Sequence, residues 1–348
     1  MIYVVLVNWN GRADTLECLE ALARCSVANL RVLVVDNASA DGSIPAFESW
    51  GRGEVSVARP AAVWDLLPPA ERRPVSLAVI AREDVGRAVP DTFVSVIAAG
   101  ANLGFAGANN LGIRQALADP ACDYVWILNN DTVTSPDAPA LLAARMAAQP
   151  TLGILGATLL FYHDPQHVQT IGSWWGTRTV RGGPVFFRAH RDDLPSQAEV
   201  ESRIDYVSGA SMFTSRAFLE TVGPMSEDYF LYYEELDWTR RMRGRFELGW
   251  CPEAIVYHKE GASIGTSSVK RPSDTSLYYY YANLFRFYRK FHPYFLPLAW
   301  ARWLWDLRRY WLGGDREATK VMRHAAGDVL KGNRRTGKID LAVLGAAR

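Results

Sequence analysis

The sequence has few cysteines, almost no net charge and no long apolar run, and each of these absences excludes a class of protein. Its 348 residues include only the scattered cysteines Cys18, Cys25, Cys122 and Cys251, without the close pair that marks a zinc site. We therefore expect reduced cysteines that pack inside a cytoplasmic protein. The formal net charge of +1 argues against a nucleic-acid-binding protein held by phosphate contacts.

A membrane-spanning segment is also not expected. No apolar stretch reaches the roughly 18 residues that are needed to cross a bilayer. The first residues lack a basic leader, and Asn8 interrupts the apolar run at 2–7, which we interpret as a strand rather than a signal peptide. With 49% hydrophobic residues, the chain can form one large or two modest domains with real cores.

The order of apolar segments predicts an α/β fold. Residues 1–160 alternate between strand and helix patterns, which is typical of a doubly wound sheet. Prolines and mixed charges at 51–92 indicate a surface insertion with a short hairpin at 75–81. Strands are expected at 2–7, 30–35, 93–98, 124–128, 152–162, 206–213 and 248–257, and helices at 13–24, 104–117, 136–148, 215–222, 277–292 and 294–312.

The central apolar run at 124–128 ends abruptly at three polar side chains, Asn129, Asn130 and Asp131. In an open α/β sheet, ligands bind at the carboxyl ends of the strands, so Asp131 is placed to hold a divalent cation and, with it, a phosphorylated ligand. An Asx turn before a helix that Pro136 opens is the structural alternative.

Two other strand ends carry polar groups. Asp36 ends the second strand, where a nucleotide-binding sheet commonly meets a ribose or base, although it could equally cap the helix that begins near Ser43. Asn102 and Gly104 follow the third strand, where small residues let the backbone approach a ligand and asparagines can bond sugar hydroxyls. The glycine spacing is not a dinucleotide fingerprint, which counts against a dehydrogenase.

A second chemical centre is expected at 205–243. Gly209 and Ala210 would allow the close approach of an acceptor, and Glu234, Glu235 and Asp237 are costly to place together without a proton, a metal or an arginine partner. The helix dipole and salt-bridge spacing from Asp237 to an arginine could explain two of these three acids. His258, at a later strand end, becomes a ligand candidate only if it reaches Asp131.

Two aromatic regions remain. The segment 163–204 carries tryptophans and phenylalanines that could form a sugar-binding wall, although an ordinary hairpin is the favoured interpretation. The expected helices at 277–292 and 294–312 combine tryptophan, tyrosine and arginine, as a helix in a membrane interface does, but packing on the catalytic domain or on a second subunit would use the same residues. We expect a catalytic domain at 1–268 and a helical membrane-surface or oligomerisation region at 269–348.

Taken in order, the motifs resemble family 2 glycosyltransferases with a GT-A fold, especially the bacterial branch that includes rhamnosyltransferases of cell-surface polysaccharide assembly. The matching pieces are Val7-Asn8-Trp9-Asn10-Gly11, Val35-Asp36-Asn37-Ala38-Ser39, Asn102-Leu103-Gly104-Phe105-Ala106-Gly107, Leu128-Asn129-Asn130-Asp131-Thr132, Ser208-Gly209-Ala210, Tyr232-Tyr233-Glu234-Glu235-Leu236-Asp237 and His258-x-x-Gly261-x-Ser263.

The resemblance implies a role for each matching position. Asp36 would accept a hydrogen bond from the nucleobase, with Asn8 and Asn10 in the same pocket. Asp131 looks like the metal-binding acid of the family's Asp-x-Asp signature, whose first acid is here Asn129, and His258 resembles its late metal ligand. Glu235 stands in the place of the usual catalytic aspartate, which lengthens the arm of the base by one methylene. The donor site would further include Asn102, Gly104 and Asn130, and the acceptor site Gly209, Ala210, Glu234 and Asp237.

The resemblance also implies an inverting transfer of a sugar from dTDP-rhamnose or a UDP-sugar to a hydroxyl of a glycan or lipid-linked saccharide. A divalent metal, Mn²⁺ or Mg²⁺, would neutralise the leaving pyrophosphate. We expect a cytoplasmic protein peripheral on the inner face of the plasma membrane, with no nucleic-acid partner and with a homo-oligomer as a further option. The alternatives are a catalytically inert partner subunit and a nucleotidyltransferase, although the latter would want a charged loop after the first strand, which Asn8-Trp9-Asn10-Gly11 lacks.

Overall fold

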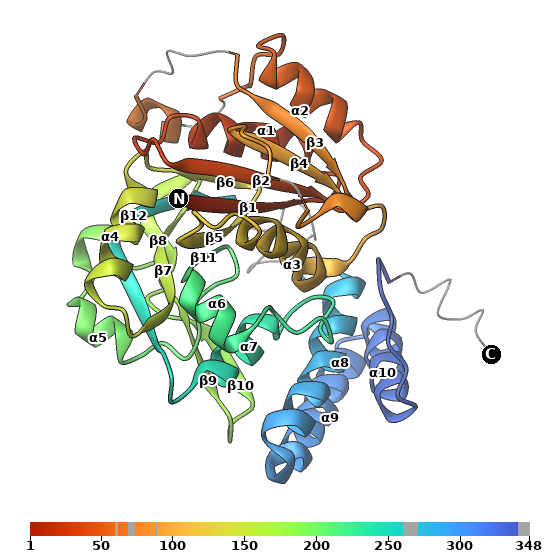
Figure 1. Cartoon of the computed structure of the whole chain (residues 1–348). Helices are drawn as coiled ribbons and strands as arrows, with labels where there is room; N and C mark the ends of the chain where they lie inside the picture. Colours follow the sequence, from red (N-terminus) through yellow and green to blue (C-terminus); the bar gives the residue numbers. More distant parts are fainter. Residues whose placement is uncertain (60–61, 69–73, 88, 260–270, 340–348) are drawn as a thin grey trace.

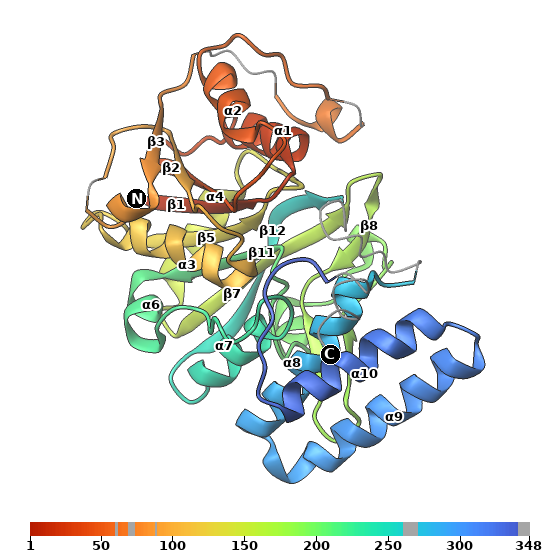
Figure 2. The same cartoon turned by 90° about the vertical axis from the view of Figure 1, so that its right-hand side faces the viewer.

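The computed structural model describes residues 1–59, 62–68, 74–87, 89–259 and 271–339. One large mixed sheet crosses the molecule, with helices on both of its faces and a helical unit at one end (Figures 1 and 2). Neighbouring strands follow the order β3-β4-β2-β1-β5-β11-β7-β12-β6, and β8 pairs with β7.

The sheet strands are β1 (Ile2–Asn8), β2 (Leu30–Asp36), β3 (Leu77–Ala81), β4 (Val94–Ala98), β5 (Tyr124–Asn129), β6 (Thr132–Thr134), β7 (Leu152–Phe161), β8 (Asp164–Thr170), β11 (Ser211–Ser215) and β12 (Glu247–His258). A separate small sheet pairs β9 (Ser173–Gly176) with β10 (Arg181–Pro184).

The helices are α1 (Arg12–Leu22), α2 (Ser43–Gly51), α3 (Gly104–Leu117), α4 (Ala138–Ala148), α5 (Gln197–Glu201), α6 (Arg216–Val222), α7 (Glu234–Met242), α8 (Asp274–Phe291), α9 (Leu296–Leu312) and α10 (Arg316–Leu330). Short 3-10 turns lie at Ala62–Leu66, Arg82–Asp84, Arg191–Asp193 and Pro293–Phe295.

The N-terminal half of the sheet is parallel, as the alternating pattern predicts. β1 pairs in parallel with β2 and β5, and its register sets Asn8 opposite Asp36 and Val7 opposite Asn129. The polar strand ends therefore meet at one edge of the sheet, which is the place that the topology of an open α/β sheet reserves for ligands. Beyond β5 the sheet becomes mixed, because β11 runs antiparallel to both β5 and β7.

Two local predictions are wrong. The stretch 75–81 forms no hairpin: β3 pairs in parallel with β4 at the edge of the main sheet, and Val63 and Val75 nearby are buried, so part of 51–92 belongs to the core. The strand expected at 206–213 begins only at Ser211, because residues 208–211 form a turn in which the amide of Ser211 bonds the carbonyl of Ser208. Gly209 and Ala210 consequently lie before the strand.

The C-terminal helices form a compact unit that packs on the rest of the chain. The aromatic face of α8 is buried in a cluster that includes Tyr278, Tyr281 and Phe285 of the helix and Tyr229 and Tyr233 before α7. A membrane-interface role is therefore wrong for α8, since its rings pack on the domain instead. The expected domain boundary at 268/269, like Gly261 and Ser263 of the last motif, lies outside the described residues.

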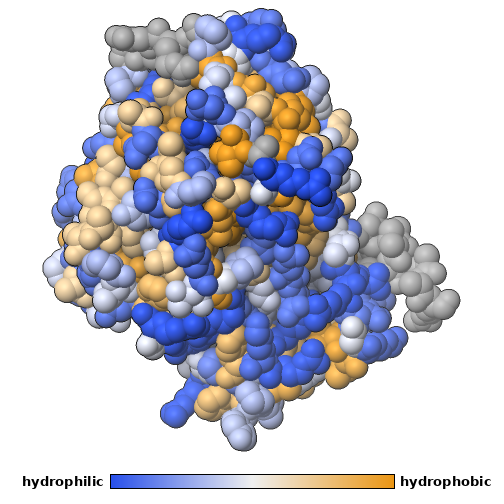
Figure 3. All heavy atoms as spheres, viewed as in Figure 1, coloured by the Kyte–Doolittle hydropathy of each residue, from blue (hydrophilic) through white to orange (hydrophobic). Residues whose placement is uncertain are grey.

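In α9, by contrast, Trp305 and Trp311 are exposed to 58% and 60%. Within the described ranges, no helix has the length and apolar character that crossing a membrane requires. On the face seen in Figure 3, hydrophilic and apolar residues are interspersed over the lower part of the molecule.

Candidate active site

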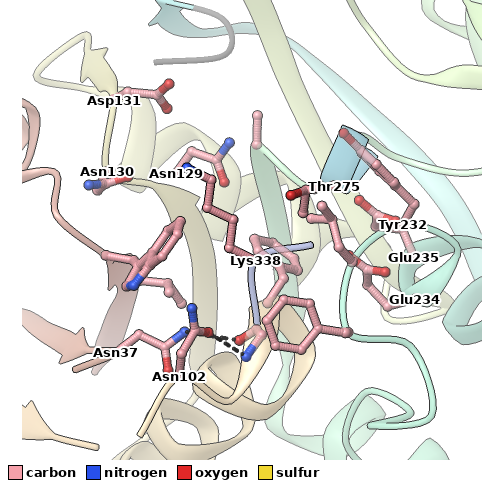
Figure 4. Close-up of a pocket in the computed structure, with 18 of the residues that line it drawn as sticks. Asn37, Asn102, Asn129, Asn130, Asp131, Tyr232, Glu234, Glu235, Thr275 and Lys338 are labelled. Atoms are coloured by element: carbon pink, nitrogen blue, oxygen red, sulfur yellow. Dashed lines mark hydrogen bonds between the residues drawn. The ribbon is translucent and has the colours of Figure 1, made fainter. Parts of the chain in front are cut away.

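A cavity of about 620 Å³ lies at the ligand-binding edge of the sheet. Two walls face each other across it (Figure 4). The sheet wall consists of Val7, Trp9, Asn37, Asn102, Asn129, Asn130, Asp131 and His258, and the helix wall of Phe230, Leu231, Tyr232, Glu234, Glu235, Ser273, Thr275, Gly337 and Lys338. Gly104, Phe105, Ser208, Gly209 and Ala210 complete the lining.

Asp131 and His258 lie close together in space, although 127 positions separate them in the sequence. His258 Nε2 lies 3.1 Å from Asp131 Oδ1, and both side chains are largely buried. Because β12 pairs with β6, His258 stands opposite Thr132, next to Asp131 in the chain. The condition that the sequence sets for His258 as a ligand candidate is thus met.

Gln169 fixes the orientation of the imidazole. His258 Nδ1 lies 2.6 Å from Gln169 Oε1. An amide oxygen can only accept, so Nδ1 donates to Gln169 and Nε2 is the ring nitrogen that faces Asp131. Burial acts to raise the pKa of Asp131, but the charge and hydrogen bond of His258 outweigh it and the pKa is lowered.

This nitrogen and carboxylate pair fits a divalent metal. Manganese accepts imidazole and carboxylate ligands, and a neutral imidazole held by a partner at its other nitrogen is the usual ligand form. In the described part of the chain, no group of three His, Cys, Asp or Glu side chains comes close enough to hold a metal. The pair would therefore need further ligands from a substrate or from water.

Asp36 and Asn8 form a closed network behind the cavity rather than in its lining. Asn8 Nδ2 donates to Asp36 Oδ1 at 2.8 Å and to Ser39 Oγ at 2.9 Å, while Asn8 Oδ1 accepts from Thr15 at 2.8 Å. The amide of Ser39 donates to the other oxygen of Asp36 at 3.1 Å. This network fixes the chain that leaves β1 and β2.

Asn10 also lies outside the cavity lining. It is exposed, has a left-handed backbone with φ of 52°, and accepts from the amide of Ala40 at 2.7 Å. Asn37 and Asn102 line the cavity instead. Their side chains are joined, because Asn37 Nδ2 donates to Asn102 Oδ1 at 2.9 Å.

The pair Glu234 and Glu235 lines the opposite wall, at the start of α7. Burial raises the pKa of Glu235 to about 6, while backbone groups of Glu235 and Gly209 act in the opposite direction. Burial and the neighbouring charge of Glu235 raise the pKa of Glu234 well above its usual value, and Glu234 Oε2 has no hydrogen-bond partner in the described structure. A carboxylate whose pKa lies near neutral pH is suited to general base catalysis.

Gly209 makes room for Glu235. A Cβ atom at position 209 would lie 2.3 Å from Glu235 Oε1 and 3.4 Å from the ring of Phe105. Since real contacts at 2.3 Å do not occur, only glycine lets the carboxylate occupy this place.

Asp237 belongs to the structure of α7 and does not line the cavity. Its side chain is fully buried and pairs with Arg241 at 2.8 Å and with Lys290 at 2.5 Å. The salt-bridge spacing that the sequence shows is therefore realised with Arg241. Both carboxylate oxygens have a cationic partner, which leaves this side chain little capacity for an acceptor.

The turn before α7 is strained. Tyr232 and Tyr233 both have left-handed backbones, with φ of 68° and 76°, which bulky residues rarely adopt. Asn283 of α8 holds the turn, because its Nδ2 donates to the carbonyl of Leu231 at 2.7 Å and to that of Tyr232 at 3.2 Å. The C-terminal unit thus positions Glu234 and Glu235.

Gly104 is also required by its position. Its φ is 73°, and an added Cβ would lie 2.4 Å from the carbonyl oxygen of Phe230, which accepts from the amide of Phe105. The backbone at the start of α3 therefore lies directly against Phe230 of the helix wall.

The aromatic side chains of 163–204 do not form the sugar-binding wall that the sequence left as the less favoured alternative. Trp175 is buried against Tyr233 and Phe287, Trp174 is exposed, and neither lines the cavity. The region is the ordinary hairpin that the sequence favours. The rings that do line the cavity are Trp9, Phe105, Phe230 and Tyr232.

Sequence reasoning missed several residues of the site. Thr275, Gly337 and Lys338 reach the cavity from the C-terminal unit, and Gln169 and Asn283 position other groups. Asn283 carries a signal that could have been noticed, since it is an amide inside an aromatic helix and needs a buried partner.

Comparison with known proteins identifies the class of this fold. Residues 79–203 match the sequence profile of Glycosyl transferase family 2. The mixed sheet with flanking helices is the GT-A fold. Because the matched segment begins at residue 79, it includes most of β3 and all of β4.

Three proteins illustrate the similarity. The chain is 25% identical over 171 residues to the low-salt glycan biosynthesis hexosyltransferase Agl10 of Haloferax volcanii, across 48% of this chain and 52% of that protein. The chain thus spans about half the length of this curated relative.

Two solved structures share the fold at low identity. The mannosyltransferase PcManGT of Pyrobaculum calidifontis, in complex with GDP-Man and Mn²⁺, has a TM-score of 0.51 and 16% identity, over 99% of this chain and 78% of that chain. GalNAc-T7 with UDP, GalNAc and Mn²⁺ has a TM-score of 0.52 and 12% identity, over 82% and 50% of the two chains.

Proposed function

We propose that this protein is a metal-dependent, inverting glycosyltransferase that uses a nucleoside-diphosphate sugar. The observation that carries the proposal is the pairing of Asp131 with His258 on one wall of a cavity whose other wall presents Glu235 with a pKa raised to about 6. The solved structures with a similar fold contain GDP-Man or UDP together with Mn²⁺, which supports a nucleotide-sugar donor and a divalent metal.

Glu235 is the proposed general base. An acceptor hydroxyl is too weakly acidic to attack unaided, so a carboxylate within hydrogen-bond distance takes its proton during attack. Because Glu235 is the one base proposed and no carboxylate nucleophile is assigned, the displacement is direct and inverts the anomeric carbon. NMR of the product that showed a retained configuration would contradict this mechanism.

The donor would lie along the sheet wall. Asn37 and Asn102 provide amide groups for a base or sugar, Asn129 and Asn130 lie beside Asp131, and Gly104 allows the close approach of a ligand. Asp131 and His258 would hold Mn²⁺ or Mg²⁺, which when bound neutralises the charge of the leaving diphosphate. Asp36, Asn8 and Asn10 support this wall from behind.

The acceptor would enter between Gly209, Ala210 and the pair Glu234 and Glu235. We propose dTDP-rhamnose or a UDP-sugar as donor and a glycan or lipid-linked saccharide as acceptor, in bacterial cell-surface polysaccharide synthesis on the cytoplasmic side of the membrane. The name of the Haloferax volcanii relative, a glycan biosynthesis hexosyltransferase, agrees with an acceptor of this kind.

Contact with a membrane would involve α9. Its exposed side chains include Leu298, Leu304, Trp305 and Leu312, with Arg308 exposed on the same helix. Tryptophan with leucine and arginine suits the interface of an anionic bilayer. Co-sedimentation with anionic liposomes that Trp305→Ser does not weaken would contradict this part of the proposal, and a second copy of the chain is the alternative partner of this surface.

A thermal-shift screen tests the function. UDP, dTDP, GDP and CDP are added to the wild-type protein, each with and without Mn²⁺. One nucleotide should raise the melting temperature only when the metal is present, because a ligand that binds the folded state stabilises it by mass action. Asp131→Ala and His258→Ala should abolish this metal-dependent shift, whereas His163→Ala, which removes an exposed histidine outside the cavity lining, should retain it.

Two outcomes would favour the alternatives. A wild-type protein that no nucleotide stabilises would favour an inert partner subunit with the same fold. Stabilisation by nucleoside triphosphates and not by diphosphates would favour a nucleotidyltransferase.

A further inference from the structure

The chain returns to the cavity after its last helix. Residues 331–339, here called the return segment, leave α10 and run back toward the sheet, as Figure 2 shows. Gly337 and Lys338 of this segment line the cavity. Gly337 has a φ of 83°, a backbone conformation that favours glycine and turns the chain at this point.

Contacts on both sides of Lys338 fix its backbone. The hydroxyl of Tyr279 donates to the carbonyl of Gly337 at 2.9 Å. The amide of Ile339 donates to Thr275 Oγ1 at 3.1 Å, and the Ile339 side chain is buried in the aromatic cluster with only 6% exposure. Since the residues before and after it are held by α8, Lys338 has a defined place on the helix wall.

Among the described residues, Lys338 differs from Arg334 and Arg335 in having no carboxylate partner. Arg334 and Arg335 of the same segment pair with Asp228 and Asp328, each at 2.5 Å. Lys338 has no carboxylate partner within the described ranges, and among the described residues that line the cavity it is the single lysine or arginine. Figure 4 shows Lys338 between the sheet wall and the helix wall.

We infer that Lys338 binds the diphosphate of the nucleotide, so that the return segment completes the donor site from the side opposite Asp131 and His258. The inference rests on the proposed function. An ammonium group on a flexible four-carbon arm forms charge-assisted hydrogen bonds with phosphate oxygens without a fixed geometry. In a cavity that contains Asp131, Glu234 and Glu235, this cation offsets the repulsion that an anionic ligand meets.

Calorimetric titration tests the inference. The probe is whichever of UDP, dTDP, GDP and CDP stabilises the wild-type protein with Mn²⁺, compared with the corresponding monophosphate. Lys338→Gln should weaken diphosphate binding about tenfold, because a charge-assisted hydrogen bond is lost. Binding of the monophosphate should weaken less, and Lys338→Arg should restore most of the diphosphate affinity. The matched control is Lys331→Gln, which removes the same charge from an exposed position of the return segment outside the cavity lining.

The outcomes separate this inference from the proposed function. Diphosphate binding that Lys338→Gln leaves unchanged, in a protein whose wild type binds, overturns the role of Lys338 alone. An equal loss in Lys331→Gln overturns it too, since the effect would then be one of general charge. A wild-type protein that binds none of the four diphosphates overturns the proposed function and this inference with it.

Discussion

The two walls of the cavity differ in how their polar groups are satisfied. Behind the sheet wall, Asn8 and Asp36 use their side-chain groups in a closed set of hydrogen bonds. On the helix wall, Glu234 has an oxygen without a partner, and Tyr232 and Tyr233 before it are strained. The sheet wall is thus a rigid frame for binding. The helix wall contains the strained backbone and the unpaired buried carboxylate, and such features are typical of groups that react.

The two walls are also held in place by different parts of the molecule. Local contacts at the ends of β1 and β2 hold the sheet wall, since Asn8 and Asp36 end two strands that pair directly and Ser39 follows β2. The helix wall depends on α8, through Asn283 and the buried aromatic cluster. Substitutions in the frame should therefore act mainly on stability, and substitutions on the helix wall mainly on activity.

The largest expected effect is that of Glu235→Gln. Loss of the general base should lower kcat by roughly 10²- to 10⁴-fold while the protein still folds and binds nucleotide with metal. Steady-state kinetics with the nucleotide sugar, together with the thermal shift, measure both properties. Glu234→Gln is the comparison on the same helix: if it removes activity and Glu235→Gln does not, the base is Glu234.

Gly209→Ala should have the next largest effect. The added Cβ would lie 2.3 Å from Glu235 Oε1, so the carboxylate must move. A displacement of about 1 Å can lower the rate roughly 100-fold. The measurement is kcat at an unchanged melting temperature. Gly327→Ala, at a helix position where a Cβ meets nothing within 4 Å, is the matched control and should retain activity.

Asn8→Ala tests the frame. The substitution removes the hydrogen bonds that Asn8 makes with Asp36, Ser39 and Thr15, which should lower the free energy of unfolding by about 1–3 kcal/mol. Urea denaturation measures the change, and the exposed Asn29→Ala is the control. A stable Asn8→Ala protein with a large loss of kcat would contradict the division between frame and reacting wall.

The smallest expected effect is a pH dependence of stability at Glu235. Its pKa is raised from 4.5 to about 6 in the folded state, so the acid contributes stability below pH 4.5 that is lost as the pH rises through about 6. Glu235→Gln lacks this titration. Relative to the wild type, the variant should therefore gain roughly 1–2 kcal/mol between pH 4.5 and pH 7.5.

Thermal unfolding of both proteins at these two pH values measures the difference, and the exposed Glu253→Gln supplies the baseline. A difference that stays constant with pH would show that burial imposes no cost on the ionised Glu235.

Much of the frame was predictable from the sequence. Apolar runs that end in polar residues gave the positions of β1, β2 and β5, and the adjacency of Asn129 and Asp131 to a strand end placed them at the ligand-binding edge. The helix α6 and the ion pair of Asp237 with Arg241 also followed from the sequence pattern. These features depend on residues that are neighbours in the chain. Periodicity and turn chemistry specify the geometry of such neighbours.

The pairing of β3 with β4 was not predictable in the same way. Residues 77–81 alone fit a hairpin as well as a parallel edge strand, and only the free edge of β4 selects the second option. The burial of the α8 aromatics was equally open, because the same rings suit a membrane interface and a protein core.

By itself, the sequence determined which strand ends are polar, the order of the motifs and therefore the GT-A fold, in which residues 79–203 match the profile of Glycosyl transferase family 2. Only the tertiary structure decided that Gln169 orients His258 across 89 positions, that Asn283 holds the turn before Glu234, and that Lys338 enters the cavity. The physical reason is that an amphipathic pattern fixes which side of an element is buried, whereas the partner of a buried polar group depends on how distant elements pack.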